Sequence, residues 1–257
     1  MPAIAAIKHL TVAGFVALAI SAAPTAKADE LTILSAAAVR PALIEVPPLY
    51  AKASGHRVTV SFGNATAIQN KVAAGDPVDV VILPPAQLDP LVRQGLLNAG
   101  RPFGVVRLGV AARAGGTQSA VASPDEFKRA LLAAPSFGMP DPADGSTSST
   151  YLVKLMNELG IADAMRPKIK LFPDGTKALE AVAKGEIALT VAPVTSIHVV
   201  AGVQLVGPLP EALQLKTVYA AALTAKSAGA EAAKGLMTML FSPEVAALLK
   251  QKGIDQP

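Results

Sequence analysis

Four short stretches of small polar residues have the composition of anion-binding turns. They lie at residues 35–40, 63–66, 145–150 and 174–176, each after an apolar run typical of a strand and before a helical pattern. A helix N-terminus offers free N–H donors and a partial positive charge to an anion. The same residue types also cap helices without any ligand, so one such stretch alone favours capping. Four of them, in corresponding positions of two half-chains, favour a shared anion-binding cleft.

One arginine and several hydroxyl and amide side chains in these stretches are candidate ligand-binding residues. The Arg40 guanidinium can pair with a carboxylate through two hydrogen bonds, although a solvated arginine before Pro41 is an equally good interpretation. Small neighbouring Ala and Gly residues let the backbone approach a ligand. The residues that we predict to contact the ligand are Ser35, Arg40, Asn64, Thr66, Ser146, Thr147, Ser148, Ser149 and Thr176.

The sequence lacks the signatures of common enzyme classes. It has no G-x-S-x-G nucleophile motif, no Walker phosphate-binding loop and no H-E-x-x-H zinc motif. The serines of residues 146–149 have no obvious histidine base. Asp141, Asp144 and Asp174 are candidates for the base of a proton shift, but such acids more often cap helices. We therefore assign no catalytic residue.

The N-terminus has the three parts of an export signal. Lys8 and His9 form a basic region, residues 10–23 are mostly apolar, and residues 26–28 (Ala-Lys-Ala) form a small-x-small cleavage site. We expect cleavage near Ala28 and a periplasmic mature protein. Removing residues 1–28 takes two of the 23 basic residues and none of the 19 acidic ones, so the remaining charge is nearly balanced. This balance of charge gives no indication of nucleic-acid binding. Separately, we expect the mature protein to be a monomer.

Metal and thiol chemistry are also not indicated. The chain contains no cysteine, which excludes a cysteine nucleophile, thiolate metal sites and disulfides. His56 and His198 are the histidines beyond the leader, and they are far apart in sequence without a metal-ligand motif. We expect no metal and no cofactor.

Strand-like runs alternate with helical periodicity along the rest of the chain, which predicts an α/β fold with largely parallel sheets. A helix over residues 41–54 should be bent or broken by Pro47 and Pro48. The other predicted helices cover residues 65–74, 149–159 and 176–184, followed by two closing helices, the last from Ser242 and Pro243 to Gly253. The predicted strands are residues 31–34, 58–62, 78–83, 105–112, 136–139, 169–172, 187–192 and 218–223.

Several of these segments resemble the periplasmic molybdate-binding proteins of ABC transporters. The similar segments are residues 34–39 (Leu-Ser-Ala-Ala-Ala-Val), 61–66 (Ser-Phe-Gly-Asn-Ala-Thr), 74–82, 140–151, 184–190 and 242–246. The resemblance implies the two-lobed periplasmic binding protein fold, with two crossover strands near residues 103–112 and 218–223 and a ligand cleft between the lobes. It places lobe 1 at residues 29–104 plus 221–257 and lobe 2 at residues 105–220. It also implies an ABC transporter permease as partner.

The departures from that family concern the ligand. The resemblance places two ligating serines at Ala38 and Ala65, and a ligating tyrosine at Ala192. Because these donors are missing, we predict a small anion with carboxylates rather than molybdate. Bacterial aconitate isomerase resembles the same family, so an enzyme that interconverts trans- and cis-aconitate by a proton shift in this cleft is the alternative to a binding protein.

Overall fold

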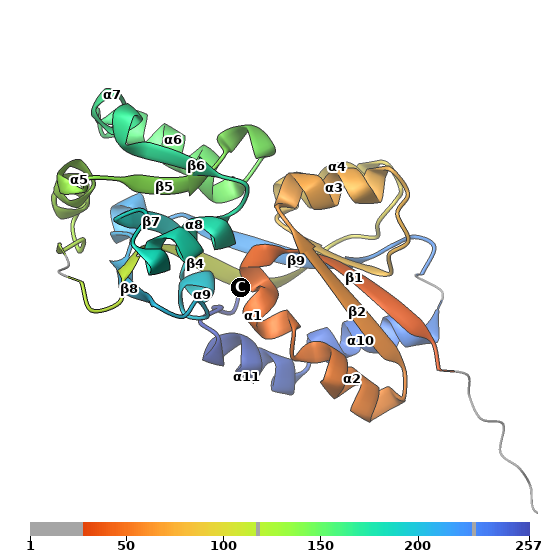
Figure 1. The fold of residues 1–257 in the computed structure, drawn as a ribbon. Coiled ribbons are helices and arrows are strands. Elements are labelled where there is room, and N and C mark those ends of the chain that lie inside the picture. The colour runs from red at the N-terminus through yellow and green to blue at the C-terminus, as the bar shows by residue number, and fades with distance from the viewer. Residues whose placement is uncertain (1–27, 117–118, 228–229) are drawn as a thin grey trace, which may run out of the picture.

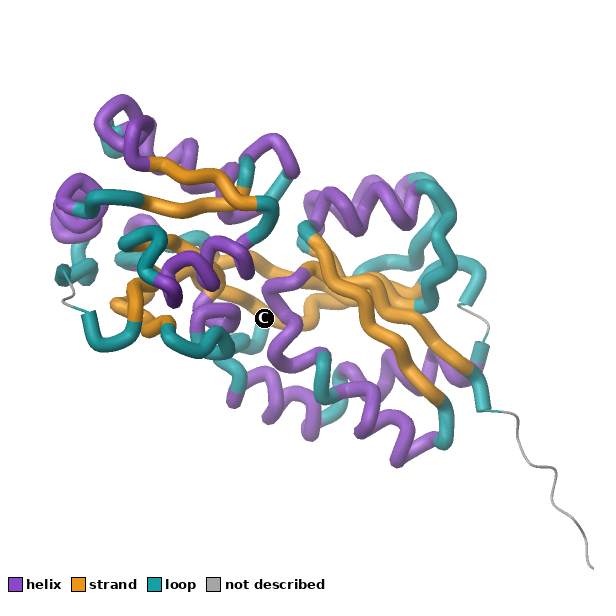
Figure 2. The backbone as a smooth tube through the Cα atoms, in the orientation of Figure 1, coloured by secondary structure: helices purple, strands orange, loops and turns teal. Residues whose placement is uncertain are grey.

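The computed structural model describes residues 28–116, 119–227 and 230–257 of the chain, and the predicted leader lies outside them except for Ala28. Figure 1 shows two lobes side by side, and strands run from one lobe into the other. In each lobe the strands lie inside and most helices outside (Figure 2). The two-lobed α/β fold is therefore as predicted.

The first lobe is built on strands in the sheet order β2 (Arg57–Gly63), β1 (Glu30–Ala36), β3 (Val80–Leu83), β9 (Lys216–Leu223) and β4 (Arg101–Arg113). Strands β1, β2 and β3 are parallel, and β9 is antiparallel to both β3 and β4. Helices α3 and α4 lie on one side of β1 and β2, and α2 and α10 lie on the other (Figure 1). The elements of this lobe are β1 (Glu30–Ala36), α1 (Arg40–Leu43), α2 (Val46–Ser54), β2 (Arg57–Gly63), α3 (Ala65–Ala73), β3 (Val80–Leu83), α4 (Pro85–Arg93), β9 (Lys216–Leu223), α10 (Glu231–Leu240) and α11 (Pro243–Gln251).

The second lobe continues the same hydrogen-bonded path through β4 (Arg101–Arg113) as β4-β7-β5-β6, with β8 also paired to β4. Strand β5 is parallel to β6 and β7, whereas β7 and β8 are antiparallel to β4. The elements of this lobe are α5 (Pro124–Ala133), β5 (Phe137–Pro140), α6 (Thr147–Glu158), α7 (Ala162–Met165), β6 (Ile169–Phe172), α8 (Gly175–Lys184), β7 (Leu189–Pro193), α9 (Val194–Ile197) and β8 (Val203–Pro208). Short 3-10 turns also occur: η1 (Ala37–Val39) joins β1 to α1 in the first lobe, and η2 (Pro142–Asp144), η3 (Arg166–Lys168) and η4 (Glu211–Leu213) lie among the second-lobe elements.

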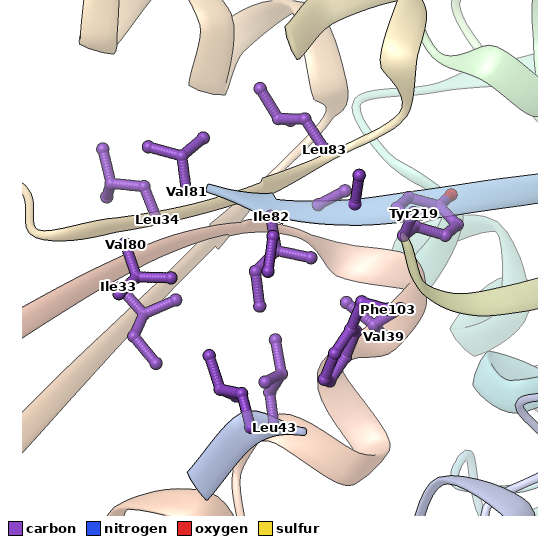
Figure 3. Packing of buried hydrophobic residues seen from close by; sticks show 14 of the residues in the cluster. Ile33, Leu34, Val39, Leu43, Val80, Val81, Ile82, Leu83, Phe103 and Tyr219 are labelled. Atoms are coloured by element: carbon purple, nitrogen blue, oxygen red, sulfur yellow. The ribbon is translucent and has the colours of Figure 1, made fainter. Parts of the chain in front are cut away.

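The buried residues divide into a core for each lobe. The core of the first lobe runs from Leu31 to Val106 and resumes from Tyr219 to Ile254. Figure 3 shows its centre, where Ile33 and Ile82 of neighbouring strands pack toward the helix that carries Leu43. The main core of the second lobe uses residues between Leu108 and Leu209. The exact lobe boundaries at residues 104 and 221 stay a prediction.

Several elements differ from the sequence-based expectation. The helix over residues 41–54 is broken, as expected, but the break comes before the prolines. Helix α1 ends at Leu43 and α2 begins at Val46, so Pro47 and Pro48 lie in the first turn of α2, where a missing N–H costs nothing. The strand expected at residues 105–112 begins earlier, at Arg101, and the sheets are mixed rather than largely parallel. Helices α4 and α5 and strand β8 were not predicted. Pro90 inside α4 weakens its helical pattern. The start of α5 did carry a signal, because Ser123 and Glu126 form a capping box around Pro124.

Within the described residues, no single helix is long and apolar enough to cross a membrane. Helices α10 and α11 reach that length and composition only together, across a bend of 49°. Their apolar residues Leu236, Val245 and Leu249 are buried in the core of the first lobe.

A matched pair of isoleucine substitutions tests the first core. Ile82→Ala should lower the free energy of unfolding by about 2–5 kcal/mol, because it leaves a cavity at a fully buried site. Ile44→Ala removes the same atoms from a residue that is 55% exposed. This substitution should change the free energy of unfolding by less than about 0.5 kcal/mol. Urea denaturation measures both values. Equal losses would contradict the placement of these two side chains.

Candidate functional site

A pocket lies between the two lobes, where the carboxyl ends of five strands meet. Ligands of open α/β sheets bind at this edge, because helix N-termini follow the strand ends. The ends of β1 and β2, with the residues that follow them, form the first-lobe wall of the pocket. The ends of β5, β6 and β7 form the second-lobe wall. The pocket is lined by residues 36–38, Arg40, 62–65, Val106, Leu108, Pro140, Asp144, 146–148, 173–176, Ala192, Pro193, Ser196, Leu215, Thr217 and Tyr219.

Six of the nine predicted ligand-binding residues line this pocket: Arg40, Asn64, Ser146, Thr147, Ser148 and Thr176. The remaining three use their hydroxyls inside the protein. Ser35 and Ser149 are fully buried and donate to the carbonyl oxygens of Ala36 and Ser146, both at 3.1 Å. The Thr66 hydroxyl donates to the Gly145 carbonyl at 3.2 Å. We therefore leave these three out of the proposals below.

Three helices point their N-termini toward the pocket, and two of them are already capped. Asn64 accepts a hydrogen bond from the Ala67 N–H at the start of α3, and Asp174 accepts from the Lys177 N–H at the start of α8. Capping is therefore a sufficient explanation for these two side chains. At α6 the N-cap residue Ser146 makes no side-chain cap, and its hydroxyl lies 3.2 Å from the Ser148 hydroxyl. The first-turn donors of this 12-residue helix are left for another acceptor.

Arg40 is the cationic side chain of the pocket lining. Its guanidinium lies over the Phe62 ring, with Cζ 4.6 Å from the ring centroid. Stacking occupies the face of the guanidinium and leaves its N–H edge available. Arg40 makes no ion pair with any residue that the structure describes. A carboxylate in the pocket can therefore pair with it.

Of the three aspartates considered as possible bases, one has an uncommitted carboxylate at the pocket. Asp174 caps α8, and Asp141 lies outside the lining and accepts from the Ala143 N–H at 2.9 Å. Asp144 lines the pocket, and none of the hydrogen bonds between described side chains uses its carboxylate. Asp144 is thus the acid best placed for proton transfer.

The floor of the pocket comes from the crossover strands, and sequence reasoning missed its polar residues. Val106 and Leu108 of β4 line the pocket. So do Leu215, just before β9, and Thr217 and Tyr219 within it, at alternating positions. Ser196 of α9 adds a hydroxyl to the second-lobe wall. The period-two spacing of 215, 217 and 219 was the signal that could have identified this face.

Two hydrogen bonds join the lobes beside the pocket. The Thr195 hydroxyl of α9 donates to the Ala38 carbonyl of η1 at 2.7 Å. On the other side, the Thr66 hydroxyl donates to the Gly145 carbonyl. Gly145 has a φ of +72°, and a Cβ there would collide with Thr66, so this close approach requires glycine. Both bonds favour the arrangement in which the lobes enclose the pocket.

Replacing Thr195 by valine tests this link between the lobes. Thr195→Val keeps the shape of the side chain and leaves the buried Ala38 carbonyl without its partner, so we expect a larger radius of gyration in small-angle X-ray scattering. Thr190→Val is the control, because the Thr190 hydroxyl donates at the same 2.7 Å distance to Gly138 inside the second lobe. Thr190→Val should lower the free energy of unfolding by about 1–3 kcal/mol. The radius of gyration should stay as in the wild type, because the lobes remain closed. The same radius for both variants would contradict the link.

Comparisons with known proteins agree with this geometry. The chain is 29% identical to an aconitate isomerase of a Pseudomonas species over 231 residues, 87% of each chain. It is 25% identical to the molybdate-binding protein ModA of Escherichia coli K12, over 96% of this chain and 97% of ModA. The resemblance to molybdate-binding proteins is therefore confirmed.

Solved structures show the same fold at lower identity. The periplasmic molybdate-binding protein of Azotobacter vinelandii has a TM-score of 0.70 at 19% identity, covering 88% of this chain and 99% of that one. The sulfate-binding protein SubI of Mycobacterium tuberculosis has a TM-score of 0.70 at 21% identity, and the match covers 89% of this chain and 87% of SubI. A model of the family described as bacterial extracellular solute-binding protein matches residues 31–255. Because this match spans most of the chain, the protein belongs to the bacterial extracellular solute-binding proteins.

Proposed function

We propose that the protein is a periplasmic solute-binding protein that captures a small organic anion in the interlobe pocket for an ABC transporter. One observation carries the proposal: Arg40, whose guanidinium has no ion-pair partner among the described residues, lines the same pocket as the N-terminus of α6, which has no side-chain cap there. Both attract negative charge, and both offer N–H donors. The expected removal of residues 1–28 and the similarity to a molybdate-binding transport protein support export and the transporter partner.

A carboxylate suits the pocket better than molybdate for two reasons. First, Ala38, Ala65 and Ala192 line it at the positions where the resemblance places ligating hydroxyls, and each missing donor to a charged ligand costs about 1.5–3 kcal/mol. Second, the pocket offers about 180 Å³, whereas one water needs roughly 10–15 Å³ of such space. It therefore has room for an organic anion larger than a tetrahedral oxyanion.

Titration with a panel of anions tests the proposal. We expect trans-aconitate or citrate to raise the melting temperature, and molybdate and sulfate to have little effect. A ligand at 100 times its Kd raises the free energy of unfolding by about 2.7 kcal/mol. For a chain of this size, this corresponds to a rise of roughly 5–10 °C in the melting temperature. Stabilisation by molybdate with no response to carboxylates would refute the carboxylate preference, and no response to any anion would refute the proposal itself.

Arg40 should be essential for the affinity of the anion that binds. Losing a hydrogen-bonded charge costs about 1.5–3 kcal/mol, so Arg40→Ala should raise the Kd by roughly 10- to 150-fold in isothermal titration calorimetry. Arg101→Ala is the matched control, because Arg101 also lies over a phenylalanine ring, 3.9 Å from the Phe241 centroid, but away from the pocket lining. Equal effects of the two substitutions would show that Arg40 has no special role.

An isomerase is the second candidate, favoured by the similarity to an aconitate isomerase and by the uncommitted Asp144 carboxylate in the pocket. In such a reaction a base removes a proton from the methylene carbon of trans-aconitate, the double bond shifts, and a proton returns to the other end of the allylic system. Asp144 is the candidate base, and Arg40 would hold a substrate carboxylate.

Nuclear magnetic resonance in deuterated water separates the two candidates. A binding protein leaves trans-aconitate unchanged and free of deuterium after long incubation. An isomerase produces cis-aconitate, and Asp144→Asn should then abolish conversion while largely keeping binding. Turnover that survives Asp144→Asn would exclude Asp144 as the base.

A further inference from the structure

The three tyrosines of the chain differ in how their hydroxyls are bound. The Tyr50 hydroxyl donates to the Ala232 carbonyl at 2.6 Å, and the Tyr151 hydroxyl donates to the Leu213 carbonyl at 3.0 Å. Tyr219 is only 5% exposed, yet its hydroxyl has no hydrogen-bond partner among the described residues. A buried tyrosine normally pairs its hydroxyl. Among the described residues the Tyr219 oxygen is not one of the fully enclosed, unpaired side-chain atoms, so it is open to the pocket that Tyr219 lines.

The ring of Tyr219 packs against the core of the first lobe, but this packing does not explain why the residue carries a hydroxyl. In Figure 3 the phenol oxygen points away from the neighbouring core side chains of Phe103 and Val39. Tyr219 lines the pocket floor together with the apolar residues Val106, Leu108 and Leu215. Phenylalanine would pack against the same core equally well. The hydroxyl therefore adds one polar group to a mostly apolar floor, facing the pocket.

The chemistry of this hydroxyl is that of a neutral donor. Burial raises the pKa of the Tyr219 phenol far above its ordinary value, so the proton stays on the oxygen at physiological pH. A neutral O–H at the partly apolar floor of a pocket can donate to a carboxylate or carbonyl oxygen. The floor position of Tyr219 also separates it from Arg40, which belongs to the first-lobe wall at the start of α1.

We propose that Tyr219 binds the ligand, its hydroxyl donating to an oxygen atom of the anion at the pocket floor. This inference rests on the proposed function, and it narrows the ligand to an organic anion with a second oxygen group beyond the carboxylate held by Arg40. A di- or tricarboxylate or a hydroxycarboxylate has this form. The phenol comes from crossover strand β9, whereas the family pattern places its tyrosine on the second lobe, at Ala192.

The test compares Tyr219→Phe with Tyr151→Phe in calorimetric titrations with trans-aconitate, citrate and molybdate. Tyr219→Phe should raise the Kd of the bound carboxylate at least tenfold and leave the melting temperature without ligand unchanged or higher. Tyr151→Phe, whose hydroxyl is paired outside the pocket lining, should lower the melting temperature and change the Kd less than twofold.

A second readout comes from tyrosine emission, because the chain has three tyrosines and no tryptophan. The emission of the wild type should change on binding, and most of that change should vanish in Tyr219→Phe. If a carboxylate binds and Tyr219→Phe changes its Kd less than twofold, the Tyr219 assignment is wrong and the proposed function stands. If none of the three anions binds the wild type, the proposed function fails, and the Tyr219 assignment fails with it.

Discussion

The geometry of the site depends on one long strand shared by both lobes. The first half of β4 pairs with β9 in the first lobe, and its second half pairs with β7 and β8 in the second. Because both sheets are hydrogen-bonded to the same 13 residues, the carboxyl ends of β1 and β2 face those of β5, β6 and β7. The pocket lies at this meeting point. The crossover strands that connect the lobes also form its floor.

This arrangement explains why side chains of similar type have different uses. Asn64, Asp174, Thr66 and Thr195 satisfy backbone groups at helix ends or between the lobes, so they hold the walls in place. The α6 N-terminus, Arg40 and the Tyr219 hydroxyl have no such internal partner among the described residues. In our account these three features take up the negative charge and oxygen atoms of the ligand. Alanines at positions 38, 65 and 192 give the space that a larger anion needs.

The sequence predicted the fold class and most of the strands, with their ends shifted by a few residues, because apolar runs and turn residues are local signals. It predicted the site less well, because the direction of a side chain depends on distant packing. Ser35 belongs to a polar turn in sequence but is fully buried at the end of β1. Tyr219 lies in what reads as a plain apolar strand, and its missing partner becomes visible only once β9 is placed against β4 and the second lobe.

A crystal structure of the mature protein grown with trans-aconitate would test the central claim most directly. We expect the ligand between the lobes, with one carboxylate on the Arg40 guanidinium and the first-turn amides of α6, and another oxygen within hydrogen-bond distance of the Tyr219 hydroxyl. A ligand bound outside this pocket, or one inside it that contacts neither Arg40 nor the N-terminus of α6, would contradict the account.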